Sequence, residues 1–250
     1  MLYGNYHGYY SKRPAANDAR LSVLPKTLFS GATVLDIGCN EGWVTCEIAQ
    51  RLGARKVVGV DIDERLVNGA WRRRRAVWSL QGNGDDGDGD WDYFPASCEH
   101  EFGSLPVPPA AAAVLPAEKH GFPHNVAFRT VDWVEEEMVE DKEGYDVVMA
   151  LSLTKWVHLN KGDEGLERLF RRVYRVLRSG GTFVLEPQPW ETYAKAKRQQ
   201  PRLRETGHVL QLHPDEFPEL LESIGFEFSQ DLGLVGDGGF SRPIVLYTKP

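Results

Sequence analysis

The sequence predicts an α/β protein in which helices flank a mostly parallel, seven-stranded sheet. Three observations support this prediction: short apolar runs alternate with helical segments, a glycine-containing turn follows the first run, and an acid ends the second. Alternating strands and helices are typical of doubly wound sheets. The 250 residues fit one large domain, which we expect to cover 1–250.

The first half of the chain contains three expected strands and two expected helices. Each strand is a short apolar run, and each helix has apolar residues at helical spacing. The first run, ATVLDI, ends at Gly38, and the second, KVVGVDI, contains Asp61. The expected strands are 32–37, 56–62 and 125–131, and the expected helices are 44–52 and 64–80.

The second half supplies the remaining strands. Strands are expected at 145–151 and 181–185, with a helix between them that Gly180 and Gly181 end. In that helix apolar residues repeat at helical spacing, with arginines on the other face. Its apolar residues are Leu166, Leu169, Phe170, Val173 and Leu177. A further helix is expected after His213 and Pro214, and the last strands, 226–229 and 244–248, are expected to pair antiparallel.

One segment interrupts this pattern. Residues 81–123 contain a Gly/Asp run, the stretch PVPPAAAAVLPA and no clear periodicity. The segment is too long for a compact connection, and its composition is typical of disorder. We therefore expect a disordered acidic and Pro/Ala-rich insertion at 82–120.

Composition limits the compartment. No run of 18 apolar residues occurs, so we expect no membrane span, and the first residues lack the features of a secretory signal. The three cysteines, Cys39, Cys46 and Cys98, show neither a paired framework nor metal-ligand spacing. We therefore expect no metal site and a reducing compartment, the cytoplasm or the nucleus.

The net charge of −7 is unevenly distributed. Residues 82–104 hold seven acids and no Lys or Arg, so the remainder is neutral and carries basic clusters. Such clusters can bind a phosphate-rich partner, although solvated helix faces explain them equally well. The clusters are Arg72, Arg73, Arg74 and Arg75; Arg168, Arg171, Arg172, Arg175 and Arg178; and Lys195, Lys197, Arg198, Arg202 and Arg204.

The turn DIGCNEG at 36–42 indicates a cofactor site. Asp61 lies 23 residues after Gly38, where an acid can accept hydrogen bonds from two ribose hydroxyls. Asn40 occupies the place of the middle glycine of a dinucleotide motif, and Glu41 would repel a pyrophosphate. S-adenosylmethionine has no phosphate and carries a sulfonium cation, so the turn favours it over a nicotinamide dinucleotide.

Asp132 follows the third expected strand and has two interpretations. Its carboxylate could accept from the adenine amine of the cofactor. Alternatively it caps a helix, since Glu135 follows three residues later.

The segments LSLTKWVHLN at 151–160 and EPQPW at 186–190 follow the fourth and fifth expected strands. Ligands bind beyond the carboxyl ends of such strands. Trp156 and Trp190 could stack on an unpaired base or pack within their loops. His158 could contact the substrate or hydrogen-bond within its loop. We expect the side chains of Glu186 and Gln188 to bond the backbone of 151–160.

Seven motifs of the chain can be compared with those of known families. They are YGNYHGYY at 3–10, RLSVLP at 20–25, VLDIGCNEG at 34–42, GVDID at 59–63, LSLTKWVHLNKGDEGL at 151–166, GGTFVLEPQPW at 180–190 and RPIVLY at 242–247. Together they resemble the bicoid-interacting / methylphosphate capping enzyme family of RNA methyltransferases. The resemblance runs almost end to end and is interrupted by the insertion. It implies a Rossmann-like class I methyltransferase domain and methyl transfer from S-adenosylmethionine to the 5′-terminal phosphate of a small non-coding RNA, the γ-phosphate in the capping branch.

The resemblance also implies roles for individual residues, and it places Tyr3, Arg13 and Arg20 in a segment over the ligands. We expect Lys155, Arg13, Arg20 and Lys161 to supply countercharge to the phosphate. The implied catalytic residues are Lys155, Tyr3 and Arg13. The implied cofactor residues are Arg20, Gly38, Cys39, Asn40, Asp61, Ile62, Asp132, Trp133, Leu151 and Ser152. The implied RNA and phosphate contacts are Tyr3, Arg13, Lys155, Trp156, His158 and Trp190.

The family further implies an RNA partner with a 5′ phosphate end, a La-related RNA-binding protein as a second partner, a monomer and a nuclear location. The sequence leaves two alternatives open. One is a small-molecule or protein methyltransferase, and the other is an RNA-binding scaffold that has lost turnover. The identity of the RNA, and whether it ends in a mono- or triphosphate, cannot be read from these residues.

Overall fold

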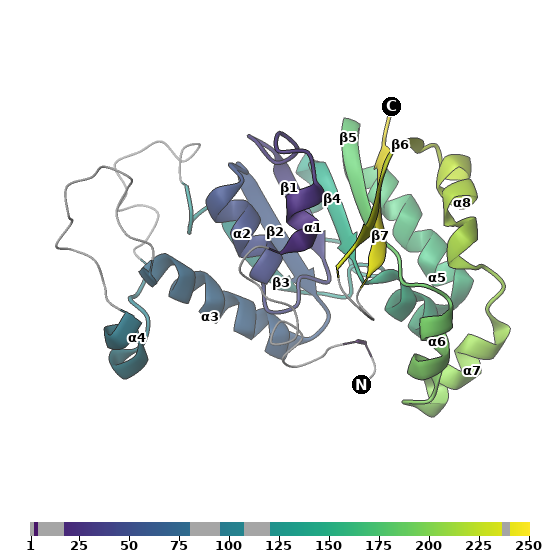
Figure 1. Ribbon diagram of the computed structural model, residues 1–250, viewed down its shortest axis with the longest axis horizontal. Helices are drawn as coiled ribbons and strands as arrows, with labels where there is room; N and C mark the ends of the chain where they lie inside the picture. The colour runs from purple at the N-terminus through teal and green to yellow at the C-terminus, as the bar shows by residue number, and fades with distance from the viewer. Residues whose placement is uncertain (1–2, 5–17, 81–95, 108–120, 237–240) are drawn as a thin grey trace.

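The computed structural model describes residues 3–4, 18–80, 96–107, 121–236 and 241–250 (Figure 1). They form a seven-stranded sheet in the order β3-β2-β1-β4-β5-β7-β6, in which β7 is antiparallel to both of its neighbours and the other pairs are parallel. The predicted α/β fold is confirmed. The strands are β1 Thr33–Ile37, β2 Lys56–Asp61, β3 Val126–Thr130, β4 Tyr145–Leu151, β5 Leu177–Glu186, β6 Glu227–Val235 and β7 Arg242–Thr248.

Helices cover both faces of this sheet (Figure 1). They are α1 Ala19–Val23, α2 Trp43–Arg51, α3 Glu64–Leu80, α4 Ala96–Phe102, α5 Thr154–Val176, α6 Glu191–Lys197, α7 Pro201–Val209 and α8 Phe217–Ile224, with 3-10 turns η4 Val139–Glu143 and η5 Pro214–Glu216. No helix in the described part of the chain has both the length and the apolar character needed to cross a bilayer.

Successive residues of the central strands pack into two different cores. Val34 and Val57 belong to the core that contains apolar residues of α2 and α3. Their neighbours Leu35 and Val58 belong to the core that contains residues of α5 and α8. Both faces of the strands are therefore buried, which explains why the strands are continuous apolar runs rather than alternating patterns.

A third, smaller core joins α6 and α7 to the first half of α5. Trp156 and Leu159 of α5 pack there with Tyr193 of α6 and Leu203 of α7. Neither α6 nor α7 was expected from the sequence, because each is short and mostly polar. Their position beside the start of α5 brings the basic segment around Lys195 to the carboxyl edge of the sheet.

Helix α5 differs from the prediction at both ends. It begins at Thr154, so most of the expected loop at 151–160 is helical, and it bends at Gly162, whose φ is 71°. The helix ends at Val176 because Leu177 already pairs with Tyr145, before a bulge in the β4–β5 pairing. Gly180 and Gly181 therefore lie inside β5 instead of ending the helix.

The expectation of disorder across 82–120 is wrong for 96–107. Helix α4 forms there, and Arg75 of α3 donates to the Leu105 carbonyl at 2.9 Å, while the Leu105 amide donates to Ser79 Oγ at 3.2 Å. Phe102 remains 75% exposed, so hydrogen bonds rather than apolar burial attach this segment. Apolar periodicity cannot detect such an attachment. The rest of the insertion lies outside the described residues.

The arginine cluster on α3 is largely engaged within the protein. Arg73 stacks on the Trp43 ring, Arg74 donates to the Pro123 carbonyl at 2.7 Å, and Arg75 bonds the segment after α4. These contacts favour packing over the alternative of a phosphate-binding patch at this cluster.

Candidate active site

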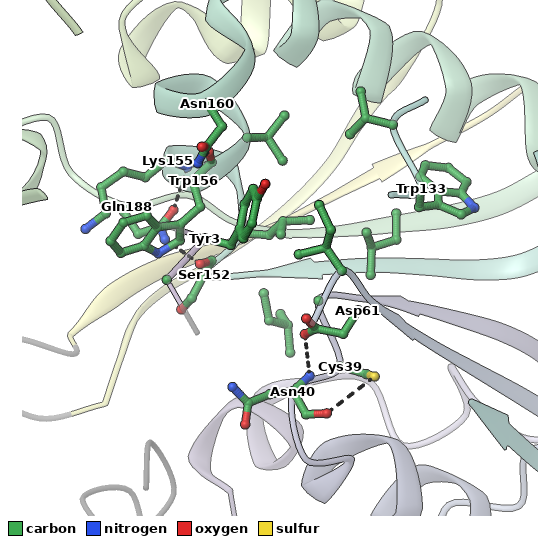
Figure 2. Close-up of a pocket in the computed structure, with 18 of the residues that line it drawn as sticks. Tyr3, Cys39, Asn40, Asp61, Trp133, Ser152, Lys155, Trp156, Asn160 and Gln188 are labelled. Carbon is green, nitrogen blue, oxygen red and sulfur yellow. Dashed lines mark hydrogen bonds between the residues drawn. The ribbon is translucent and has the colours of Figure 1, made fainter. Parts of the chain in front are cut away.

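A cavity of about 640 Å³ lies at the carboxyl ends of β1, β2, β4 and β5 and beyond β3. It is centred where the chain order reverses, since β2 and β4 lie on opposite sides of β1. Such switch points are the usual ligand sites of open α/β sheets, and the volume suits a small-molecule cofactor. Figure 2 shows Cys39, Asn40 and Asp61 grouped in one part of the cavity, Ser152, Lys155, Trp156 and Gln188 in another, and Trp133 apart from both.

The turn after β1 follows a path that brings its backbone to the cavity. The amides of Gly38 and Cys39 both donate to the Val60 carbonyl, at 2.8 and 2.9 Å. Gly38 has a φ of 78° and Asn40 a φ of 52°, both in the left-handed region. Asparagine tolerates this conformation better than most residues. A side chain at Gly38 would crowd Leu153, 3.1 Å away, so glycine keeps this edge open.

Asp61, the last residue of β2, is held by backbone donors. Its Oδ2 accepts from the Asn40 amide at 3.0 Å (Figure 2), and its Oδ1 accepts from the Asp63 amide at 3.0 Å. Burial raises the pKa of Asp61, and these hydrogen bonds oppose the rise. Each carboxylate oxygen can accept further bonds, so the fixed group suits a pair of ribose hydroxyls. The neighbouring Ile62 also lines the cavity.

Two buried side chains, those of Asp36 and Cys39, pack beneath the cavity surface at the end of β1 and in the turn that follows. Asp36 lines the cavity and accepts from Thr45 Oγ1 at 2.6 Å, and burial raises the pKa of Asp36 to about 6. The Cys39 thiol is also buried, which raises its pKa well above the ordinary value. Cys39 is therefore a neutral wall residue rather than a nucleophile.

Asp132 and Trp133 lie at a third part of the cavity. Asp132 Oδ2 is 2.7 Å from Lys161 Nζ, and its Oδ1 accepts from the Val134 amide at 3.3 Å. The Asp132 carboxylate thus caps a turn, whereas our second interpretation of this residue was that it caps a helix. Trp133 is buried, and its indole nitrogen lies 3.4 Å from Asp141. Lys161 also lines the cavity, but its ammonium group is already paired with Asp132, so a phosphate would compete with this carboxylate.

The start of α5 is braced by Gln188. Its Oε1 accepts from the Lys155 amide at 3.0 Å and from Thr154 Oγ1 at 3.1 Å, and its Nε2 donates to the Ser152 carbonyl. The expected bonds from Gln188 to the backbone of 151–160 are confirmed. Glu186 instead accepts from the Ser152 hydroxyl at 2.6 Å through its side chain and from the Ser152 amide through its carbonyl.

The Lys155 ammonium group is buried at the edge of the cavity. The residue is 7% exposed, and its Nζ donates to Thr192 Oγ1 at 3.1 Å and lies 5.1 Å from the Trp156 ring. Burial, followed by the charges of Arg242 and Lys195, lowers the pKa of Lys155 to about 8. Across the described residues no carboxylate pairs with this ammonium group. An anion that enters the cavity would supply the missing countercharge.

Arg20, by contrast, is already paired. Its guanidinium contacts Asp18 at 2.6 Å and Glu186 at 3.4 Å, and the residue is 3% exposed. Arg20 therefore attaches α1 to the end of β5 while lining the cavity.

Of the other predicted residues, four contribute to the cavity wall: Tyr3, Leu151, Ser152 and Trp156. Tyr3 is 38% exposed. Gly4 lies so close to the Trp156 ring that any side chain there would overlap it. Arg13 and most of the YGNYHGYY motif lie outside the described residues.

His158 and Trp190 do not line the cavity. His158 is fully buried, with Nδ1 3.2 Å from the Tyr193 hydroxyl and Nε2 2.6 Å from Asp163. The Trp190 ring stacks on His213 at 4.1 Å. His158 therefore hydrogen-bonds within the protein and Trp190 packs within it, as the alternatives to RNA contact proposed. Their positions do not support the expected RNA contacts.

The cavity residues that sequence reasoning did not assign to the site include Thr192, Lys195 and Arg242. Lys195 belonged to a basic cluster, and Arg242 opened the motif RPIVLY without a role. Thr192 gave no signal, because its role depends on α6, which was not expected.

Comparison with known proteins agrees with this geometry. Residues 145–249 match the profile described as bicoid-interacting protein 3, and residues 34–94 match a methyltransferase domain. The N-methyltransferase NodS of Bradyrhizobium japonicum, solved with S-adenosyl-L-homocysteine, has a TM-score of 0.59 at 11% identity, covering 100% of this chain and 95% of that one. This likeness shows the fold.

Several curated relatives match along 99% of the chain. The 7SK snRNA methylphosphate capping enzyme of Mus musculus is 40% identical, but the chain spans only 40% of its length. A probable RNA methyltransferase of Arabidopsis thaliana is 37% identical, and 79% of its length is covered. The chain therefore belongs to the bicoid-interacting protein 3 / methylphosphate capping enzyme family, with a Rossmann-like methyltransferase fold.

Proposed function

We propose that the protein transfers a methyl group from S-adenosylmethionine to the 5′-terminal phosphate of an RNA. One observation carries this proposal: a single cavity contains both the turn with Asp61 and the buried Lys155 ammonium group, which pairs with no carboxylate among the described residues. The first part suits a nucleoside, and the second suits an anion. The named activities of the mouse and plant relatives support the same assignment.

The residues of the turn fit the cofactor. Gly38 leaves room for close approach, Asp61 presents a fixed carboxylate, and Asp132 also lines the cavity. When bound, S-adenosylmethionine supplies a methyl group on a positively charged sulfur. The solved fold neighbour with S-adenosyl-L-homocysteine supports this choice.

The acceptor needs positioning more than proton transfer. A phosphate oxygen is anionic at neutral pH, so the chain has no proton to remove before methyl transfer. Lys155 would hold the terminal phosphate, and Thr192 and Gln188 keep this lysine in place from its side chain and its backbone. Orientation of reacting groups supplies much of the rate gain in such reactions. Lys155 and Lys195 provide a limited cationic surface, which avoids overstabilising the bound substrate.

A methyl-transfer assay with radiolabelled cofactor tests the proposal. RNAs of one sequence that end in a 5′ triphosphate, monophosphate or hydroxyl group are compared. We expect label on the phosphorylated RNAs, with the triphosphate preferred, and none on the hydroxyl RNA. Equal labelling of the hydroxyl RNA would contradict a phosphate acceptor, and tight RNA binding without transfer would favour the scaffold alternative.

The family resemblance supports three further proposals: a monomer, a La-related RNA-binding partner and a nuclear location. The small nuclear RNA named for the mouse relative favours the nucleus. Sedimentation tests the monomer. Affinity capture with the isolated La-related protein tests the partner, and imaging of the tagged full-length protein tests the nuclear location.

A further inference from the structure

Arg242 is a buried cavity residue to which the proposed reaction assigns no role. It is 7% exposed and is the first residue of β7. Because β7 runs antiparallel to β5, its first residue lies at the edge where the parallel strands end. The side chain therefore reaches the cavity from a strand that contributes nothing to the cofactor turn.

One contact of Arg242 is with Ser152, which directly follows β4. Its Nη1 donates to Ser152 Oγ, whose hydroxyl donates in turn to Glu186 Oε2 at 2.6 Å. Ser152 has a φ of 58°, a left-handed conformation that is unfavourable for serine. Ser152 accepts hydrogen bonds from Arg242 and Gln188 and donates one to Glu186, and these bonds offset that cost.

Ser152 lies next to the start of the helix that carries Lys155. Only Leu153 separates it from Thr154, the first residue of α5. A change in the Ser152 backbone would therefore move the first turn of α5 and the Lys155 side chain with it. In addition, Arg242 and Lys155 line the same cavity, and the positive charge of Arg242 helps to lower the pKa of Lys155.

We propose that Arg242 is a positioning residue for the phosphate end of the site: it holds the Ser152 turn and sets the electrostatic field at the Lys155 ammonium group. This inference rests on the proposed function, since it assigns Lys155 to the acceptor phosphate. The groups that face Lys155 are Arg242 from β7, Thr192 and Lys195 from α6, and the Trp156 ring from α5; Glu191 of α6 also lines the cavity.

The test compares Arg242→Gln, Arg242→Lys, Ser152→Ala and the double variant Arg242→Gln/Ser152→Ala. Arg178→Gln is the matched control, because Arg178 pairs with Asp146 at the opposite end of the sheet, outside the cavity. Three quantities are measured: kcat/KM for 5′-triphosphate RNA on either side of pH 8, the affinity for S-adenosyl-L-homocysteine, and the pKa of Lys155 by NMR of labelled lysine.

For Arg242→Gln we expect kcat/KM for RNA to fall by about tenfold or more, with cofactor affinity nearly unchanged. Loss of the positive charge should raise the pKa of Lys155, so the alkaline fall in kcat/KM moves to higher pH. Arg242→Lys keeps the charge and should leave that fall in place. Ser152→Ala should lower kcat/KM for RNA less in the Arg242→Gln background than in the wild-type chain. The reason is that both substitutions remove the same contact.

A purely structural role would lower activity without moving the pH profile, and that result would overturn the inference. So would equal losses of RNA turnover and cofactor affinity, or behaviour indistinguishable from Arg178→Gln. If the wild-type chain transfers no methyl group to RNA, the proposed function fails. The NMR titration with S-adenosyl-L-homocysteine then decides the inference: an unchanged Lys155 pKa in Arg242→Gln refutes it, and a raised one upholds the electrostatic link.

Discussion

At the scale of single residues, the cavity separates two tasks between two charged side chains. Asp61 is a carboxylate fixed by two backbone amides, and Lys155 is an ammonium group fixed by one hydroxyl. In the proposed function the first contacts the nucleoside of the cofactor, and the second contacts the terminal phosphate. Substitutions at the two residues should therefore affect different ligands.

Lys155→Ala should lower kcat/KM for 5′-phosphate RNA by roughly a hundredfold or more, the usual effect of removing one group that stabilises a reacting anion. Affinity for S-adenosyl-L-homocysteine, measured by calorimetry, should change little. Lys142→Ala, at an exposed site in η4, is the control. Parallel losses of RNA turnover and cofactor affinity would refute this division.

Asp61→Ala should weaken binding of S-adenosyl-L-homocysteine first, since two charge-assisted hydrogen bonds of about 1.5–3 kcal/mol each are expected there. Calorimetry measures the effect, and the thermal midpoint without cofactor controls for folding. Unchanged cofactor affinity would remove the ribose assignment.

The state of Lys155 predicts the dependence of activity on pH. Burial and neighbouring cations lower its pKa to about 8, so the free enzyme loses this positive charge as the pH rises through that value. Only the protonated form attracts a phosphate, so kcat/KM for RNA should fall above pH 8, whereas cofactor affinity should not follow the same curve. A flat profile through that range would show that the charge of Lys155 is not used.

At the scale of secondary-structure elements, the sequence predicted the strands better than the helices near the site. The central strands are apolar runs because both faces of the sheet are buried there, and such runs can be seen without a structure. Helices α6 and α7 are short and polar, and their packing against Trp156 and Leu159 depends on contacts distant in sequence. Thr192 could therefore not be assigned in advance.

The insertion is the element whose role can be tested by deletion. Removing 82–118 should leave methyl transfer within a few-fold of wild type, because neither α4 nor 103–107 lines the cavity. The thermal midpoint should fall slightly, since the bonds from Arg75 and Ser79 to Leu105 are lost. A shorter deletion of 82–95 keeps these bonds and serves as the control. Loss of activity in both deletions would show that the insertion takes part in function.

At the scale of the whole molecule, the order of the strands places the site. The reversal of strand order between β1 and β4 puts the cofactor turn and the start of α5 on opposite sides of one cavity. The motifs predicted Asp61, Asn40 and Lys155 as site residues, and the fold brings them to the same cavity. They could not predict Arg242, because its contact with Ser152 joins residues that are 90 positions apart.

The most direct test of the account is a crystal structure of the chain with S-adenosyl-L-homocysteine and a short RNA that carries a 5′ triphosphate. We predict that Asp61 bonds the ribose hydroxyls of the cofactor product, and that the terminal phosphate lies within hydrogen-bond distance of Lys155 Nζ and faces the cofactor sulfur. A terminal phosphate bound outside this cavity, or a cofactor product that does not contact Asp61, would contradict the central claim.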